Sequence, residues 1–436
     1  MKKNVYLKKH NKITPGRFIV LGFALVIIIG ALLLLLPISA RDGVRVSLID
    51  AFFTSTSAVC VTGLITMDTG DTFSLFGRTV VAVLIQIGGL GITSIGVFLI
   101  VLSGKKISMR NRTLVKEALN YTSFTGVISL VRYVIIVTVI IETIGMILSF
   151  IVFSQDYPFW EALGYSAFHS IAGFNNAGFD VFGGFKSLLD YKDNVLLNLV
   201  TCGLIIFGGI GFFVICEVWD KKHFKKFHLH TKIVLTVTAA LLLIGTLLLK
   251  ACEDITWLGA FFASTSARTA GFVTYPLSDF SNAGIFVLIV LMFIGASPGS
   301  TGGGIKTTTF FVLFKSVFSY SADKDCTAFK RKIPREVVRK ASVIAALAIG
   351  VVCTSTFLLT VLEPDIDFIK ILFEVTSAFG TVGLTTGITP DLNTLSKIVL
   401  IFTMFIGRLG PFVIASIWFS HTGSLASYVE EGVTVG

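Results

Sequence analysis

The stretch TSAFGTVGLTTGITP, residues 376–390, is small, polar, Gly-rich and uncharged, although apolar segments flank it. Three other stretches align with it when one glycine of each is superimposed: TSTSAVCVTGLIT (54–66), HSIAGFNNAGFDV (169–181) and FASTSARTAGFVT (262–274). The aligned glycines are Gly63, Gly178, Gly271 and Gly383. A phenylalanine stands ten residues before each glycine, and a leucine or phenylalanine follows it directly. This spacing, kept four times, indicates an internal repeat.

The surroundings of the motif repeat as well. A run long enough to cross a bilayer precedes each motif: Phe18–Leu36, Tyr133–Phe153, Ile233–Leu249 and Val343–Leu362. A segment too short to cross, roughly 10 to 14 residues, comes next and begins near an acid that suits a helix N-terminus: Asp50, Glu161, Asp254 and Asp367. A second span follows each motif: Arg78–Leu102, Val195–Val218, Ile285–Phe318 and Lys397–Phe419. Each second span carries an apolar–glycine pair, at Ile87-Gly88, Phe207-Gly208, Ile294-Gly295 and Ile406-Gly407.

These patterns predict an all-α membrane protein with eight transmembrane helices. Each of four repeats would consist of a span, a re-entrant half-helix, a loop and a second span, arranged around a pseudo-four-fold pore. The predicted repeats are residues 1–110, 111–225, 226–325 and 326–436, the last including a C-terminal tail. The composition agrees, because 54% of the 436 residues are hydrophobic and only 14% are charged, against about 25% charged in soluble domains.

The net charge of +10 does not indicate nucleic-acid binding. Lys and Arg gather in four places: the N-terminal 17 residues and residues 105–116, 221–232 and 324–340. All four lie on one side of the membrane if the repeats run as predicted, which is the positive-inside pattern. Both termini are therefore expected in the cytoplasm of a multi-pass cell-membrane protein. The six cysteines show no paired spacing, so neither a disulfide framework nor a metal centre is expected.

Four Gly-rich loops at membrane depth are predicted to form a selectivity filter. Non-helical chain survives at that depth only inside protein or beside water, and rings of carbonyl oxygens can replace the water around a monovalent cation. The predicted filter residues are Val61, Thr62, Gly63, Asn176, Ala177, Gly178, Thr269, Ala270, Gly271, Thr381, Val382 and Gly383. The structural alternative is that the glycines merely let helices pack closely, which four loops in register make less favourable.

The second span of the third repeat is interrupted by GASPGSTGGGIKTTT, residues 295–309. Pro and several glycines cannot sustain a helix, so we expect a mobile loop, residues 296–307, beneath the filter. The predicted gate residues in it are Pro298, Gly299, Gly302, Gly303, Gly304 and Lys306. A phosphate-binding loop is excluded, because the GxxxxGK[ST] spacing and a preceding strand are missing.

Two arginines lie in apolar surroundings. Arg408 interrupts the last span at the position that matches Gly89, Gly209 and Ala296. Such a charge usually faces a cavity or a partner, so we assign Arg408 to the gate as a fixed positive charge below the filter. The alternative is a buried ion pair with Glu142 or Glu217. Arg268 precedes Gly271 by three residues, and we expect it to brace the filter loop from behind rather than touch the ion.

The segment Thr381-Val382-Gly383-Leu384 resembles the TVGY part of potassium-channel filters. One such glycine in each of four repeats within one chain resembles the Trk/Ktr/HKT superfamily of potassium transporters, and most of all the membrane subunit of Ktr systems. This resemblance implies K⁺ as the transported ion, a gate loop at residues 296–307 and a functional Arg408. It also implies a homodimer and a peripheral cytoplasmic RCK-type (KtrA-like) subunit that binds nucleotide. HKT-type relatives with Ser at the first motif glycine admit Na⁺, whereas all four positions are Gly here; whether Na⁺ stimulates transport stays open.

Other function classes fit less well. An enzyme would need catalytic side chains that converge at depth, and the acids lie mainly at span ends; no organic cofactor is expected in this chain. A coupled transporter built from inverted repeats is the second hypothesis, but these four repeats run in the same direction. A module with a vestigial pore is the third, and it would tolerate Ser in place of any motif glycine. The basic segments 221–232 and 324–340 are either docking surfaces or topology determinants near anionic lipid.

Overall fold

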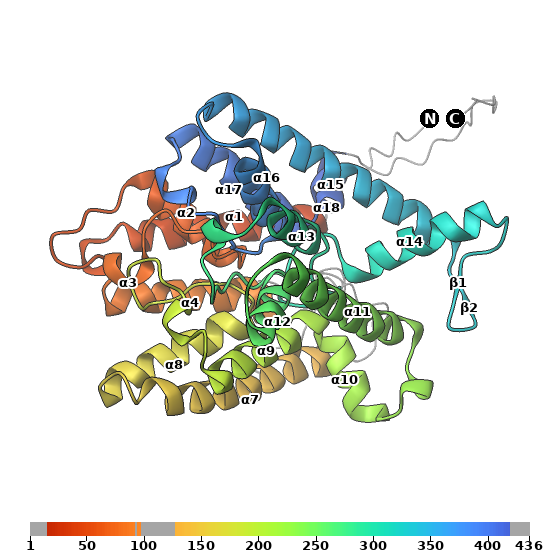
Figure 1. Ribbon diagram of the computed structural model, residues 1–436, viewed down its shortest axis with the longest axis horizontal. Coiled ribbons are helices and arrows are strands. Elements are labelled where there is room, and N and C mark those ends of the chain that lie inside the picture. Colours follow the sequence, from red (N-terminus) through yellow and green to blue (C-terminus); the bar gives the residue numbers. More distant parts are fainter. Residues whose placement is uncertain (1–14, 92–93, 97–126, 419–436) are drawn as a thin grey trace, which may run out of the picture.

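The computed structural model describes residues 15–91, 94–96 and 127–418 of the chain. This part is almost entirely helical (Figure 1), and its strands are confined to the hairpin β1 (Thr327–Ala328) and β2 (Arg331–Lys332). The predicted all-α membrane fold is confirmed. The predicted N-terminal tail, the basic segment 105–116 and the C-terminal tail lie outside the described residues.

Four long helices are apolar enough to cross a membrane and open the four repeats. They are α1 (Pro15–Leu34), α7 (Val127–Phe153), α11 (Leu229–Cys252) and α15 (Arg335–Leu362). Large hydrophobic side chains stand exposed along their outer faces, among them Leu25, Ile140, Leu247 and Phe357. An all-round apolar helix with an exposed apolar face is typical of a lipid-facing span.

Each long helix is followed by a short helix that ends inside the molecule. These half-helices are α2 (Leu48–Val59), α8 (Phe159–Phe174), α12 (Trp257–Ser266) and α16 (Phe368–Gly380). The Ser47 hydroxyl accepts a hydrogen bond from the Asp50 amide at the start of α2, and Thr256 caps α12 in the same way. Asp254 was expected near the start of the third half-helix, but α12 begins only at Trp257, after this threonine cap.

Three of the second spans differ from the prediction, because each breaks where one continuous span was expected, whereas the break in the third span was predicted. Their first parts are α4 (Leu75–Leu90), α9 (Val195–Ile210), α13 (Asn282–Phe293) and α17 (Thr394–Leu409). Three stop at a glycine with positive φ, Gly91 (+81°), Gly211 (+92°) and Gly410 (+87°), a conformation that no helix contains. The continuations are α10 (Phe212–Lys221), bent by 96° from α9, α14 (Thr307–Ser321) and α18 (Pro411–Trp418).

The four repeats close into a ring through one recurring contact. The second helix of each repeat packs against the half-helix of the next: α4 on α8, α9 on α12, α13 on α16, and α17 on α2. The last of these joins the fourth repeat to the first. The remaining short helices lie in connecting loops. They are α3 (Thr69–Thr72), η1 (Pro37–Ser39), η2 (Leu189–Tyr191), η3 (Phe224–Lys226), η4 (Leu277–Asp279) and η5 (Thr389–Asp391).

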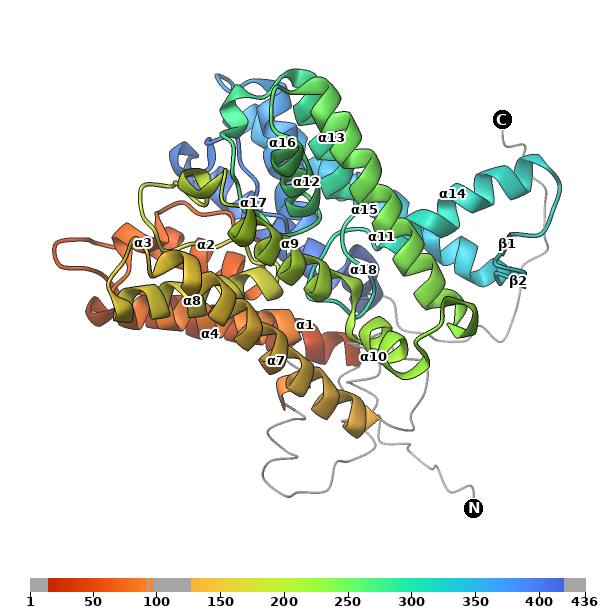
Figure 2. The ribbon, with the colours of Figure 1, turned by 60° about the horizontal axis from the view of Figure 1, so that its bottom comes forward.

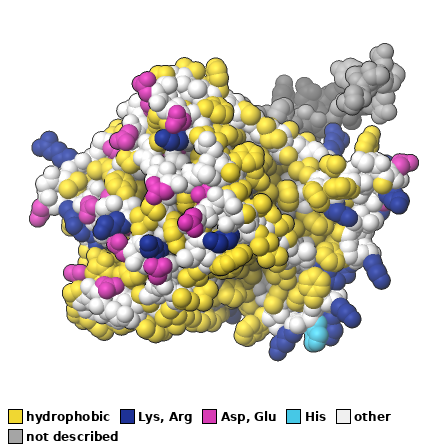
Figure 3. All heavy atoms as spheres, viewed as in Figure 1, with side chains coloured by type: hydrophobic (Ala, Val, Ile, Leu, Met, Phe, Trp, Pro, Cys, Tyr) yellow, Lys and Arg dark blue, Asp and Glu magenta, His cyan; other side chains and the backbone are white. Residues whose placement is uncertain are grey.

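The two ends of the molecule differ in charge. Figure 3 shows hydrophobic side chains across the middle, most of the acidic groups together with several Lys and Arg at the end that holds α3, and mainly Lys and Arg at the opposite end. That basic end contains α10, α14 and the β1–β2 hairpin, which project from the bundle in Figure 2. The hairpin is closed by a 2.6 Å ion pair between Lys332 and Asp325, and this hydrogen bond lowers the pKa of the Asp325 carboxyl.

Candidate functional site

The four motif glycines form a closed ring of main-chain atoms. A Cβ atom added to any of them would lie less than 3.0 Å from a carbonyl oxygen of the next repeat. The pairs are Gly63 with Ala177, Gly178 with Ala270, Gly271 with Val382, and Gly383 with Thr62. Real Cβ atoms essentially never come this close, so only glycine fits. The twelve residues predicted as filter therefore meet at one place, in the cyclic order of the repeats.

The backbone of each filter triplet alternates in handedness. Its first residue has positive φ, at Val61 (50°), Asn176 (57°), Thr269 (72°) and Thr381 (51°). Its last residue, the glycine, has φ of 90°, 67°, 80° and 91° in the same order, whereas the middle residues are not in this region. Residues with a Cβ pay to adopt positive φ. Alternation of this kind turns successive carbonyl groups toward the same side, unlike a strand, where they alternate.

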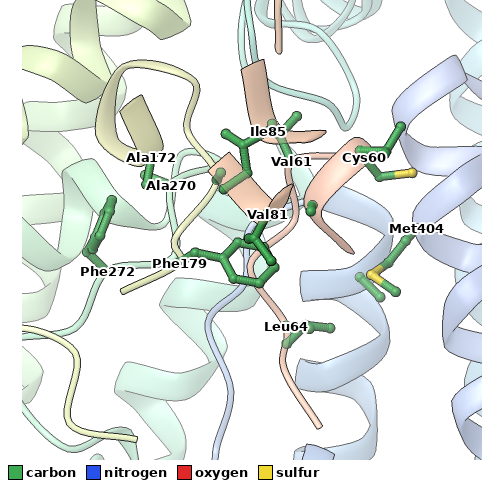
Figure 4. Close-up of a cluster of buried hydrophobic side chains, with 14 of the residues drawn as sticks. Cys60, Val61, Leu64, Val81, Ile85, Ala172, Phe179, Ala270, Phe272 and Met404 are labelled. Atoms are coloured by element: carbon green, nitrogen blue, oxygen red, sulfur yellow. The ribbon is translucent and has the colours of Figure 1, made fainter. Parts of the chain in front are cut away.

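Hydrogen bonds from the half-helix ends hold the loops in this conformation. The Ser57 and Ser377 hydroxyl oxygens accept from the amides of Gly63 and Gly383 at 3.0 and 3.1 Å. The Asn176 and Thr269 side chains join two loops by a 3.2 Å hydrogen bond. Hydrophobic side chains from all four repeats surround the filter, and Figure 4 labels Leu64, Phe179 and Phe272 among them. Together with Leu384 these are the residues directly after the motif glycines, and all four are buried. The recurring Leu or Phe after each glycine thus anchors its loop in a packed shell.

The break between α13 and α14 is a buried loop that lies directly against the filter. A Cβ on Gly302 would collide with the Thr269 side chain, and one on Gly303 with Thr381, the first residues of two filter triplets. On its other side the loop binds the second repeat: the amides of Ser297 and Thr301 donate to the carbonyls of Gly209 and Gly208 at 3.0 and 3.2 Å.

The remaining predicted gate residues lie in the same loop. The Gly299 carbonyl accepts from the Phe212 amide at 3.1 Å, and Pro298 lies against Gly211. Gly304 has φ of +66° and passes beside Gly295. Lys306 folds back so that its Nζ donates to the Gly302 and Gly303 carbonyls at 2.6 and 3.3 Å. The loop is thus held by its own lysine as well as by the second repeat.

Arg408 bridges this loop to the first repeat. Its guanidinium donates to the Thr301 carbonyl, and to the carbonyls of Gly88 at 2.5 Å and Gly89 at 3.2 Å. Within the described residues no carboxylate forms an ion pair with it. The hydrogen bonds of its guanidinium in the described part of the chain all go to carbonyl groups, and one of these belongs to the loop that contacts Thr269 and Thr381.

The ion-pair alternative for Arg408 is wrong for both acids. Glu142 accepts hydrogen bonds from Gln86 and Asn175, at 3.3 and 3.1 Å. Glu217 binds Lys221 and the His228 amide, at 2.6 and 2.8 Å. Both carboxylates are therefore occupied elsewhere.

Arg268 lies behind the third filter loop, in a small cavity that Thr238 and Gly209 also line. It is 6% exposed, and its Nη1 donates to the carbonyl of Thr238 on α11 at 3.3 Å. This contact fits the expected bracing role, because it ties the filter loop to a surrounding helix. No group of three or more His, Cys, Asp or Glu that could hold a metal ion occurs among residues 15–91, 94–96 and 127–418.

The recurring glycines of the second spans let these helices approach the half-helices closely, a role that the sequence pattern alone did not reveal. A Cβ on Gly88, Gly208 or Gly407 would collide with a main-chain carbonyl at the end of a half-helix, of Val59, Phe174 and Phe379 respectively. Three residues later stand Gly91, Gly211 and Gly410, where the helices break. These breaks were missed, although the spacing GGLG, GGIG and GRLG could have indicated them.

Comparison with known proteins places this geometry in a family. The TrkH family model, described as a cation transport protein, matches residues 18–252 and 229–420. The chain is 41% identical to the Ktr system potassium uptake protein B of Bacillus subtilis (strain 168), with 92% of each chain covered. It is 38% identical to the protein of the same name from Vibrio alginolyticus, with 98% of this chain and 97% of the relative covered. It is also 38% identical to the potassium/sodium uptake protein NtpJ of Enterococcus hirae, with 100% and 99% covered.

The fold is shared with a solved transporter. The crystal structure of the potassium transporter TrkH from Vibrio parahaemolyticus superimposes with a TM-score of 0.71 at 21% identity, over 94% of this chain and 87% of that one. The relatives are transporters, which confirms that the chain is not an enzyme, and the apolar spans make it a multi-pass membrane protein. The chain belongs to the TrkH family of cation transport proteins.

Proposed function

We propose that this chain takes up K⁺ across the cell membrane through the ring of four filter loops. The observation that carries the proposal is the closed contact of the motif glycines with the carbonyl of the next repeat, which builds the site from main-chain oxygens. The C-terminal ends of the four half-helices, which carry partial negative charge, adjoin the same ring. Such a site attracts a cation and offers oxygens in place of its hydration shell.

The choice of K⁺ over Na⁺ rests on two supports. All four ring positions are glycine, and the relatives from Bacillus and Vibrio are named as potassium uptake proteins. The name of the Enterococcus relative includes sodium, so we keep Na⁺ as a second ion that either permeates or stimulates uptake. The ions are cargo, and the proposal needs no organic cofactor in the chain.

We infer that residues 296–307 form the gate below the filter. The loop is buried, it touches the first residues of two filter triplets, and its contacts reach the second and fourth repeats. Arg408 contributes a positive charge at this level, and Lys306 ties the loop to itself through the Gly302 and Gly303 carbonyls. No carboxylate among the described residues pairs with either side chain. A cation that leaves the filter would meet this loop and the arginine first.

We also propose that a cytoplasmic RCK-type subunit that binds nucleotide controls the gate, under a homodimer of this chain. The first relatives are components of a named Ktr system. The basic segments 221–232 and 324–340 adjoin, because the rings of Phe224 and Phe329 lie 6.0 Å apart. Charge at this end also favours cytoplasmic termini. The repeat boundaries at residues 110, 225 and 325 remain a prediction.

The test is K⁺ uptake by bacteria that lack their own potassium transporters and express this chain. Gly383→Ser should abolish most of the preference for K⁺ over Na⁺, because the added side chain enters the ring. Gly387→Ser is the matched control: Gly387 has φ of +95° in the same loop, but nothing lies within 4 Å of its Cβ position. Equal ion preference in the parent and Gly383→Ser proteins would refute the filter assignment. Absence of K⁺ uptake by the parent would refute the assignment of K⁺ as the transported ion.

A further inference from the structure

A buried carboxyl group stands behind the fourth filter loop. Glu374 lies on α16, nine residues before Gly383, and is 0% exposed. Burial of an acid is costly unless hydrogen bonds compensate it, and an acid at membrane depth usually has a role. Neither the filter nor the gate as described above uses this group.

The partner of Glu374 is the segment that follows the filter on the outer side. The hydroxyl of Thr389, itself fully buried, donates to Oε1 of Glu374. Thr385 Oγ1 lies 3.1 Å from Thr389 Oγ1, and Thr385 and Thr386 also face the carboxyl group. The chain thus leaves the filter at Gly383, and within six residues it is tied back to the half-helix that began it.

Only the fourth repeat carries this pair of residue types at these two positions. Nine before and six after the motif glycine, the first repeat has Thr54 and Thr69, whose hydroxyl groups make no hydrogen bond within the described part of the chain. The third has Phe262 and Leu277, which line the same small cavity. The second has His169, which shares a 2.9 Å hydrogen bond with Thr201 on α9 instead, and Gly184. The two positions therefore adjoin in more than one repeat, but only the fourth closes them with a carboxyl–hydroxyl bond.

We propose that Glu374 is a positioning residue for ion selection, and that it acts through Thr389 by pinning the outer end of the fourth filter loop. The inference rests on the proposed filter function. The loop needs such a fastening because Thr381 adopts φ of +51°, which a residue with a Cβ adopts at a cost. Farther along, Gly387 is exposed and has nothing within 4 Å of its Cβ position, so packing does not hold that part. The carboxyl–hydroxyl bond at Thr389 fixes the chain just beyond Gly387.

The experiment compares three threonine variants in the same uptake assay, measuring initial rates for K⁺ and Na⁺ at matched amounts of protein in the membrane. Thr389→Val keeps the shape and removes the donor, so the K⁺/Na⁺ uptake ratio should fall by about tenfold. Thr389→Ser keeps the hydroxyl and should retain the parent ratio. Thr69→Val changes the equivalent, unbonded position of the first repeat and should also leave the ratio unchanged.

Glu374→Leu should lower the ratio like Thr389→Val, and the double variant should lower it no further, because both changes remove one bond. If Glu374→Leu does not reach the membrane, the threonine series still decides. An unchanged ratio in Thr389→Val, or an equal fall in Thr69→Val, overturns the proposal. A parent protein without K⁺ preference would overturn the filter function itself, which separates the two failures.

Discussion

The filter ring and the layer beneath it contrast within the same four repeats. At the filter, every repeat contributes a positive-φ residue, a middle residue and a glycine, and each glycine meets the next repeat in the same way. In the layer below, the aligned positions of the four second spans hold different residues, namely Gly89, Gly209, Ala296 and Arg408. Among the second-span helices α4, α9, α13 and α17, three end at a single glycine with positive φ, and α13 does not. In the third repeat Pro298 stands at the place of that glycine, and a loop of residues 294–306 replaces the bend.

The third and fourth repeats depart from the common pattern of this layer in ways that complement each other. The third repeat supplies the loop, the fourth supplies the arginine, and the arginine binds the loop through the Thr301 carbonyl. A ring that coordinates one ion on its axis needs four equivalent contributions, whereas an obstruction needs one moving part and something that holds it. Near-symmetry above suits the proposed filter, and asymmetry below suits the proposed gate.

Deletion of residues 299–304 should have the largest effect on this contrast. It removes the part of the loop that touches Thr269 and Thr381, while Ile294 and Ile305, which form a bridge, keep the ends of the loop together. K⁺ uptake should rise well above that of the parent in cells that contain no regulatory subunit, and ion preference should persist because the ring is intact. Deletion of residues 327–332, six residues of the exposed hairpin, is the control of equal length. Uptake at or below the parent level after removal of the loop would contradict its role as an obstruction.

Replacement of Arg408 should have the next largest effect. Arg408→Gln loses a charge and most of the contacts with Thr301, Gly88 and Gly89, each of the kind that contributes about 1.5–3 kcal/mol. We expect unregulated K⁺ uptake to rise by about tenfold. Arg408→Lys separates charge from bridging, because an ammonium group cannot reach carbonyls on both sides in the fork geometry of a guanidinium. We therefore expect unregulated K⁺ uptake to rise in Arg408→Lys as well. Uptake equal to that of the parent would mean that the charge alone causes the effect.

The upper layer could be predicted from the sequence to a large extent, because it is built from local pattern. Gly63, Gly178, Gly271 and Gly383 are readable as a repeat, and their convergence follows once four half-helices are placed around an axis. The long spans could be predicted from hydropathy, since a helix that crosses the bilayer needs about 20 consecutive apolar residues. The break in the third repeat was also readable, because Pro298 and its neighbouring glycines exclude a helix.

The contacts of the lower layer could not be predicted in the same way. A single glycine costs a helix only about 1 kcal/mol, so Gly211 inside a long apolar run did not indicate a bend of 96°. Arg408 binds carbonyl groups 107 and 320 residues away, and main-chain partners leave no mark in a sequence. The alternative of an ion pair with Glu142 or Glu217 therefore stayed open in the sequence, although both acids are engaged elsewhere.

The smallest effect on transport, and a sharper test of the shared helix contacts, should come from two glycines of α9. A Cβ on Gly208 would collide with the Phe174 carbonyl at the end of α8, whereas one on Gly203 would meet nothing within 4 Å. Gly208→Ala should therefore push α9 away from the half-helix and lower stability by about 1–3 kcal/mol. Gly203→Ala should be neutral or slightly stabilising, because alanine favours helix over glycine by about 1 kcal/mol. Thermal midpoints of the purified proteins in detergent measure the difference. Equal midpoints would mean that α9 can yield at Gly208 without loss, and the close approach would then be a feature of packing that the filter does not need.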